Sequence, residues 1–192
     1  MEPRIDNPMT LPTPTTTSAL PLKPGSWVLD KAHVRVGFSV RHLGVSKVHG
    51  FFADVDADLI VGSSLDDTAV NASIALASID TGNADRDAHL RSNELLDIEQ
   101  RPTMAFRSTG ISGSGDDWTL DGDLTIGDVT RPISLDVEFG GVAEFFDGTR
   151  HAGFEARGEL RRKDFGLTFG PLDRMLGQVV KVQLDLEFIE PT

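Results

Sequence analysis

Alternation of apolar and polar residues runs through most of the chain after Trp27, and it restricts the fold more than any other feature. The last such segment is the clearest, with an apolar residue at every even position from Val180 to Phe188. Successive side chains of a β-strand point to opposite faces, so this period of two predicts strands with one buried and one hydrated face. Roughly eight segments show the pattern, most of them joined by tight turns such as Gly127–Asp128 and Asp147–Gly148.

Antiparallel strands joined in this way are typical of a closed β-barrel or a two-sheet sandwich. Several segments are long, and a strand of about 12 residues spans roughly 40 Å. In a closed barrel, long tilted strands enclose a deep interior that either is filled by side chains or holds one small ligand. The predicted inner face includes several small residues: Ala53, Ala57, Ala72, Ala152, Ala156 and Gly158. A barrel lined in this way would contain a void, whereas in a filled sandwich the same residues would face larger partners, and the composition leaves both open.

The size and charge of the chain exclude several classes of protein. With 192 residues, it can form one domain with a substantial core but is short for two. Its formal net charge of −12 argues against binding to nucleic acid or to an anionic membrane surface. The chain has no cysteine, which excludes disulfides and thiolate chemistry. No apolar run is long enough to span a membrane.

The first 24 residues differ in composition from the rest. They contain six of the ten prolines and a threonine cluster from Thr13 to Thr17. Because proline lacks the N–H group and fixes φ, we expect residues 1–24 to form a disordered tail and residues 25–192 to form the β domain. No basic cluster is followed by an apolar segment of the kind found in signal peptides, so we expect a cytoplasmic protein.

Two stretches interrupt the strand pattern. Residues 78–106 contain many charged side chains, and we expect a short helix or two there that cover one end of the barrel. The apolar side of this helical region would be formed by Leu90, Leu95, Leu96 and Ile98. Its polar side chains, Arg86, Asp87, His89 and Arg91, would form a network that anchors it to the barrel. Residues 162–178 are rich in glycine and apolar residues. These apolar side chains would either pack on the outside of the barrel or in a dimer interface, or form a movable lid that touches a ligand.

The histidines and acidic residues offer a weaker case for catalysis. A zinc site needs three or four ligands within about 2.0–2.3 Å of the ion, and no compact motif such as HExxH is present. Acidic residues early in a helix are explained by the helix dipole. We therefore expect no metal, no cofactor and no catalytic residue. The alternative is a metal-dependent enzyme built on His33, His42, His49 and His89.

Four segments resemble the YceI-like proteins in order and spacing, over residues 25–188. They are GSWVLDKAHVRVGFSVRHLGVSKVHGFF (25–52), DRDAHLRSNELLDIEQRPTMAFRS (85–108), GDLTIGDVTRPISLDV (122–137) and RRKDFGL (161–167). The resemblance implies a lipocalin-like antiparallel barrel whose long apolar tunnel binds a polyisoprenoid or a similar lipid, without catalysis. The chain departs from the family's pattern at Gly127–Asp128, where a basic residue followed by glycine is more common, and at Val34, where serine is common.

We therefore predict an all-β fold with a small helical insert, an eight-stranded antiparallel lipocalin-like β-barrel. It would bind, and could store or carry, a long apolar lipid such as a polyisoprenoid, and its outer face could pair with a second copy of the chain. A filled β-sandwich that acts as an interaction module is a further alternative. The predicted ligand-binding residues are Val36, Phe38, Val55, Ile74, Phe106, Leu124, Leu135, Phe154 and Leu184 in the lining, with Phe165, Phe169 and Met175 at the entrance.

Overall fold

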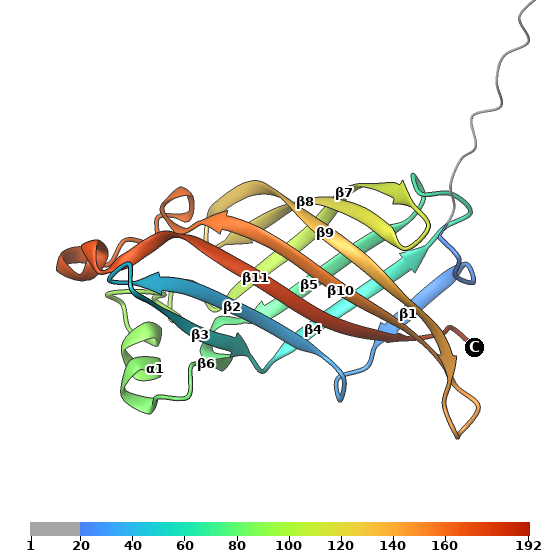
Figure 1. The fold of residues 1–192 in the computed structure, drawn as a ribbon, viewed down its shortest axis with the longest axis horizontal. Helices are drawn as coiled ribbons and strands as arrows, with labels where there is room; N and C mark the ends of the chain where they lie inside the picture. Colours follow the sequence, from blue (N-terminus) through green and yellow to red (C-terminus); the bar gives the residue numbers. More distant parts are fainter. Residues whose placement is uncertain (1–19) are drawn as a thin grey trace, which may run out of the picture.

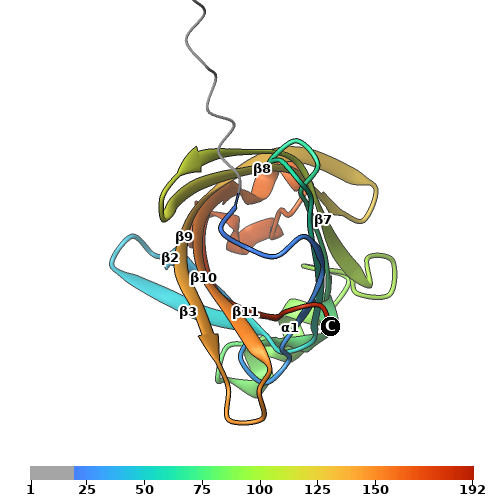
Figure 2. The ribbon, with the colours of Figure 1, turned by 90° about the vertical axis from the view of Figure 1, so that its right-hand side faces the viewer.

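The strands hydrogen-bond in a ladder that returns to its first member (Figures 1 and 2). The computed structural model describes residues 20–192, so the greater part of the predicted tail lies outside the described residues. The strands are β1 (Gly25–Leu29), β2 (Arg35–His42), β3 (Ser46–Phe52), β4 (Val55–Val61), β5 (Ala69–Ala75), β6 (Ile79–Asp80), β7 (Thr103–Ser114), β8 (Asp117–Ile126), β9 (Val129–Glu144), β10 (Arg150–Arg161) and β11 (Leu176–Ile189). The helical elements are α1 (Ala84–Arg91) and the 3₁₀ turns η1 (Leu76–Ser78), η2 (Arg162–Phe165) and η3 (Gly170–Arg174).

Eight strands close the ring, in the order β1, β4, β5, β7, β8, β9, β10 and β11, and β1 pairs with β11 to complete it. The short strands β2, β3 and β6 continue this wall beyond β1, β4 and β5: β2 pairs with β11, β3 with β2, and β6 with β3. The barrel therefore has eight antiparallel strands, three of them bent into two parts. This confirms the predicted fold class, and the filled two-sheet sandwich is wrong because one sheet closes on itself.

The predicted alternation determines which side chains enter the barrel. In β4, Val55, Ala57, Leu59 and Val61 are buried and the residues between them are exposed. The prediction fails at the junction of β3 and β4, where Ala53 was expected to share the inner face with Val55. The residues between the two strands shift the alternation by one, because Phe52 and Val55 both face inward and lie three residues apart. Phe51 lies under the guanidinium of Arg35, and Ala53 is exposed.

Two glycines in the wall leave room for aromatic rings. A Cβ atom at Gly50 would overlap the ring of Phe38, and a Cβ at Gly122 would overlap the ring of Phe106. Each ring therefore lies against the bare backbone of a neighbouring strand. This packing keeps both phenyl groups close to the wall.

The N-terminal segment crosses one end of the barrel, as Figure 2 shows in blue. Trp27 is only 1% exposed, and its Nε1 donates to the carbonyl of Lys23 at 2.9 Å. Lys23 Nζ in turn donates to the carbonyl of Pro191 at 2.8 Å, and Leu22 is buried in the core. Residues 20–24, which the sequence placed in the tail, thus contact the barrel.

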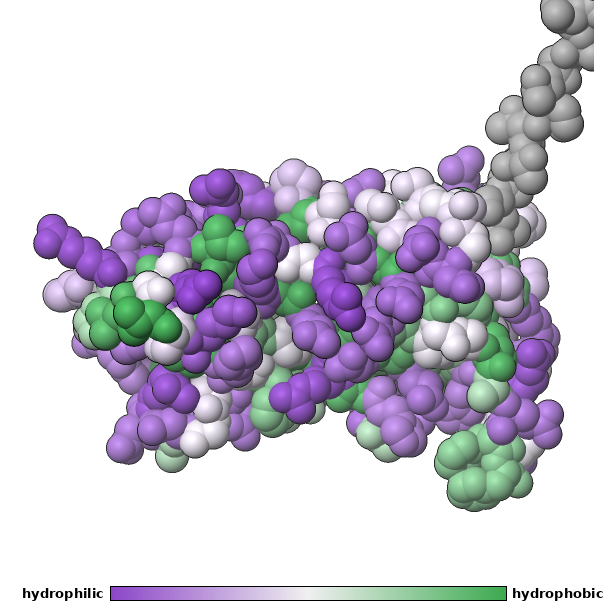
Figure 3. All heavy atoms as spheres, in the orientation of Figure 1, coloured by the Kyte–Doolittle hydropathy of each residue, from purple (hydrophilic) through white to green (hydrophobic). Residues whose placement is uncertain are grey.

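The side of the molecule that Figure 3 shows is largely hydrophilic, with small apolar patches. Phe146, in the turn between β9 and β10, is 91% exposed and stacks on Phe145 with 4.0 Å between ring centroids. Within residues 20–192, no helix is both long enough and apolar enough to cross a lipid bilayer.

Candidate functional site

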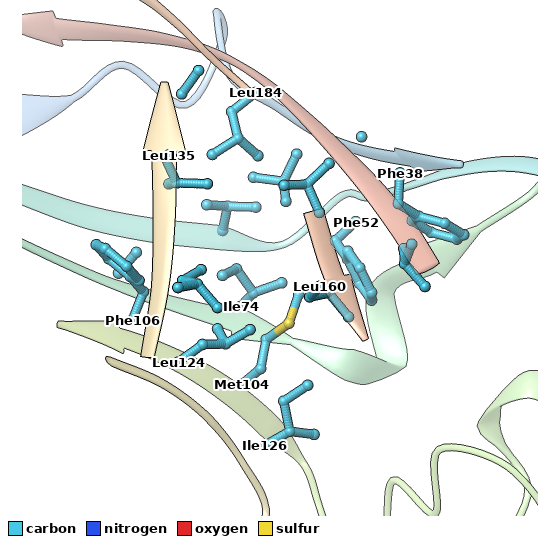
Figure 4. A pocket seen from close by; sticks show the side chains of 18 of the residues that line it. Phe38, Phe52, Ile74, Met104, Phe106, Leu124, Ile126, Leu135, Leu160 and Leu184 are labelled. Atoms are coloured by element: carbon cyan, nitrogen blue, oxygen red, sulfur yellow. The ribbon is translucent and has the colours of Figure 1, made fainter. Parts of the chain in front are cut away.

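A cavity of about 530 Å³ lies inside the barrel, and every strand from β2 to β11 contributes to its wall. Small-molecule sites in proteins measure about 300–1,000 Å³, so the cavity is large enough for a ligand. Figure 4 shows the apolar side chains that point into it, among them Phe52, Met104, Ile126 and Leu160. The wall is almost entirely aliphatic and aromatic.

The void, one of the two outcomes that the small residues left open, is present. Ala57, Ala72 and Ala156 lie on the wall of the cavity. Ala156 faces Val137 of β9 and Leu184 of β11 in the strand register, so it lies on the central part of the wall. Because an alanine extends little from its strand, these positions leave space that larger residues would fill.

The polar residues of the wall gather at one end. They come from the last residue of β2, the helix α1, the last three residues of β10 and the start of η2. They are His42, Arg86, His89, Glu159 and Arg162. Leu20, Trp118 and Phe188 line the opposite end, which the N-terminal segment covers. The cavity therefore has one apolar end and one end that carries charge, which we call the α1 end.

Helix α1 is held against the barrel by side-chain hydrogen bonds to the backbone. Asn83 caps its first turn by accepting from the N–H of Arg86 at 2.9 Å. The buried Asp87 carboxylate accepts from the N–H of Thr81 at 3.0 Å and from its hydroxyl at 2.6 Å. Arg91 donates to the carbonyls of residues 77 and 79. The Arg86 side chain donates to the hydroxyl and the carbonyl of Thr81. The predicted anchoring network is thus present for Arg86, Asp87 and Arg91.

His89 does not anchor the helix, contrary to the prediction. Its Nε2 lies 3.0 Å from Oε2 of Glu94, and its ring lines the cavity. The last turn of α1 therefore presents the histidine to the charged end of the cavity. The prediction that α1 covers one end of the barrel is confirmed.

A buried arginine organises the segment that follows β10. Arg162 is 1% exposed, and its guanidinium donates to both the carboxylate and the carbonyl of Asp173. It also donates to three further carbonyls, those of Leu167 at 2.8 Å, Leu176 at 3.2 Å and Gly177 at 2.9 Å. The hydrogen bonds from Arg162 and Lys163 hold the pKa of the Asp173 carboxyl far below its ordinary value. One side chain therefore fixes the course of residues 162–177.

This segment folds inward over the α1 end. Phe165, Leu167 and Phe169 are buried and pack with Leu95 and Leu96. The alternative that these side chains cover the outside of the barrel or a dimer interface is wrong, because they form part of the inner core. Movement of the segment as a lid stays a prediction.

The structure places all of the predicted ligand-binding residues on the cavity wall except Phe165. Phe165 was expected at the entrance, but it is buried behind the wall in the core cluster. Two further wall residues, Phe52 and Arg162, were not predicted. Phe52 was not predicted because the alternation shifts by one between β3 and β4. The only sequence signal for Arg162 was its place in the RRKDFGL segment.

The four histidines of the alternative enzyme hypothesis do not converge. His42 and His89 line the α1 end of the cavity, whereas His49 is exposed on β3. His33 follows β1 and contacts Asp30 at 2.9 Å. Within the described residues, His33 is the only member of this set found in a group of three or more potential ligands. The hypothesis of a metal-dependent enzyme built on these four histidines is therefore not supported.

Comparisons with known proteins agree with this architecture. A family model described as the YceI-like domain matches residues 27–188. A UPF0312 protein of Serratia proteamaculans is 35% identical over 182 residues, which cover 88% of this chain and 93% of that protein. The solved YCEI protein of Campylobacter jejuni is 31% identical with a TM-score of 0.70, covering 85% of this chain and 97% of that one. A solved polyisoprenoid binding domain from Saccharophagus degradans has a TM-score of 0.64 at 16% identity, covering 86% and 98%, and thus shares the fold.

Proposed function

The chain belongs to the YceI-like family, and on this premise we propose that its barrel binds one long apolar lipid, such as a polyisoprenoid, along the cavity. The observation that carries the proposal is the almost wholly apolar wall around about 530 Å³ of space. The name of the Saccharophagus degradans neighbour, a polyisoprenoid binding domain, supports a ligand of this class.

The physical basis of binding is burial of the lipid tail. Each CH₂ group transferred from water contributes about 0.8 kcal/mol, so one five-carbon isoprene unit contributes about 4 kcal/mol. Ordering of the chain and loss of its free motion offset part of this gain. A few isoprene units therefore suffice for binding without any specific polar contact.

The two ends of the cavity give the ligand a direction. The tail extends toward Leu20, Trp118 and Phe188, where none of the wall residues within 20–192 is charged. The polar end of the ligand lies near His42, Arg86 and His89 at the α1 end. This arrangement keeps a hydrated head group close to solvent while the tail is buried.

We propose binding rather than catalysis because the charged groups at the α1 end already have partners. Arg86 donates to the hydroxyl and the carbonyl of Thr81 at 2.7 and 2.9 Å. Glu159 pairs with Lys181 at 2.8 Å, and Arg162 is committed to the Asp173 carboxylate and to backbone carbonyls. We further propose that the protein stores or carries the lipid, which enters past the α1 end. A cytoplasmic location and a homodimer stay predictions of the sequence.

The proposal is tested by retention of a radiolabelled long-chain isoprenol on gel filtration. We expect the wild-type protein to retain the label and Leu184→Asp to lose it, because the new carboxylate would stand in the apolar wall. Gln183→Asp is the matched control, since it places the same group on the exposed face of the same strand. Equal retention by the two variants, with both folded by circular dichroism, would show that the lipid does not enter the cavity.

A further inference from the structure

Four side chains that can ligate a metal meet on the outer surface, away from the lipid cavity. Asp30 and His33 lie in the connection between β1 and β2, His151 is at the start of β10, and Glu187 is near the end of β11. The neighbours Ala152 and Phe188 are buried in the core, so His151 and Glu187 point outward from the barrel wall. We call these four residues the corner site.

The imidazole and carboxylate atoms of the corner site converge. Nδ1 of His33 lies 2.9 Å from Oδ2 of Asp30 and 3.9 Å from Oε1 of Glu187. Nδ1 of His151 lies 3.7 Å and 2.6 Å from the same two oxygens. A tetrahedral ion with ligands at about 2.0–2.2 Å separates them by roughly 3.3–3.6 Å. The ligand atoms of Asp30, His33 and Glu187 all lie within 4.8 Å of one another, so small side-chain shifts would bring these three atoms around one ion. A larger shift would add Nδ1 of His151 as the fourth ligand.

A second layer of hydrogen bonds orients these ligands. The hydroxyl of Thr149 donates its proton to Oδ1 of Asp147 at 2.6 Å. Thr149 Oγ1 must therefore accept from Nε2–H of His151, which lies 2.9 Å away. Nδ1, the other ring nitrogen of His151, faces Oε1 of Glu187 at 2.6 Å. A histidine that binds a metal through one nitrogen is commonly held by a hydrogen bond through the other, and Thr149 supplies that hydrogen bond here.

The position of the site also suits a metal. The side chains of Asp30 and His151 are 16% and 11% exposed, which lowers the local dielectric, while that of His33 is 54% exposed and leaves one side open to water. Two imidazole nitrogens and two carboxylate oxygens suit Zn²⁺ and similar first-row ions. Ca²⁺ and Mg²⁺ prefer sites made of oxygen alone.

From this geometry we propose that the corner site binds one zinc-type divalent ion that clamps the seam of the barrel. Strand β1 joins β11 through two residue pairs, Val28 with Ile189 and Leu29 with Phe188. One further hydrogen bond follows, from the N–H of Asp30 to the carbonyl of Glu187 at 2.8 Å. An ion held by Asp30 and His33 on one side and by His151 and Glu187 on the other would tie this short seam together.

The test is a titration of the metal-free, full-length protein with Zn²⁺ in competition with a chromophoric chelator. We expect one equivalent to bind and the thermal midpoint to rise with Zn²⁺ concentration, because the ion binds only the folded state. His33→Ala should weaken binding at least about tenfold without unfolding the protein, since its side chain is largely exposed. His151→Ala should do the same, and Thr149→Val should weaken binding about tenfold through the lost orientation of His151.

His49→Ala is the matched control, because His49 is an exposed histidine on β3 outside the site, and it should bind Zn²⁺ as the wild type does. The proposal is overturned if the wild type does not bind one equivalent at micromolar Zn²⁺. It is equally overturned if His33→Ala and His151→Ala bind as His49→Ala does. The outcome is independent of the lipid proposal, since Leu184→Asp should leave Zn²⁺ binding unchanged.

Discussion

At the scale of single residues, Arg162 fixes the segment that covers the α1 end of the barrel. It is a charged side chain buried among backbone carbonyls, so its removal leaves several acceptors without donors. We expect Arg162→Met, which keeps most of the volume, to lower the free energy of unfolding by about 3–5 kcal/mol. Chemical denaturation measures the loss, and Arg161→Met, at the exposed preceding position, should change stability little. Equal effects of the two substitutions would contradict the role given to Arg162.

The close approach of Phe106 to Gly122 gives a second residue-scale prediction. A methyl group at Gly122 would force the ring of Phe106 away from the wall, so we expect Gly122→Ala to cost about 1–3 kcal/mol of stability. Gly110→Ala is the control, because its Cβ meets no atom within 4 Å. Replacing the ring by a smaller side chain, in the double variant Gly122→Ala/Phe106→Leu, should recover part of the lost stability. A neutral Gly122→Ala would show that the ring does not depend on this glycine.

Residue-scale prediction from the sequence succeeded where the period of two holds. Val36, Ile74, Leu135 and Leu184 were placed on the wall because alternation alone fixes the face of a strand residue. Phe52 was missed because the irregular pair between β3 and β4 reverses the parity, and such an irregularity has no marker in composition. Arg162 was missed because its acceptors are up to 15 residues away in sequence and come together only in the folded chain.

At the scale of elements, the segment from η2 to the start of β11 depends on the Asp173 carboxylate. Its pKa is lowered in the folded protein by Arg162 and Lys163. The charged form therefore stabilises the fold at neutral pH, and this contribution is lost as pH falls below the ordinary value of about 3.9 toward the lower pKa of the folded state. We expect residues 162–177 to loosen in acid before the strands do.

Hydrogen exchange of residues 162–177 at pH 7 and pH 3 measures this loosening. Asp173→Asn should show fast exchange in this segment already at pH 7 and a smaller further change in acid. If the wild type and Asp173→Asn exchange alike at both pH values, the carboxylate does not hold the segment. The sequence could predict that this stretch is irregular and apolar, but its inward course depends on the contacts of Arg162.

At the scale of the whole molecule, the period of two predicted antiparallel strands but left a barrel and a sandwich open. The resemblance to the YceI-like proteins favoured the barrel. The hollow interior was one of two outcomes that the composition left open. It results from Ala57, Ala72 and Ala156 facing the axis of the barrel. The asymmetry of the cavity was not predictable, because it arises where α1, η2 and the end of β2 meet in space.

Organic extraction of the purified protein, followed by mass spectrometry, tests the central claim most directly. We expect about one long-chain lipid per protein molecule, since the cavity lies within the range of single-ligand sites. Ala156→Trp should yield less lipid, because the indole would occupy part of the cavity, whereas Arg157→Trp, on the exposed face of the same strand, should retain the lipid in full. A wild-type extract without lipid, together with no uptake of added isoprenol, would contradict the account.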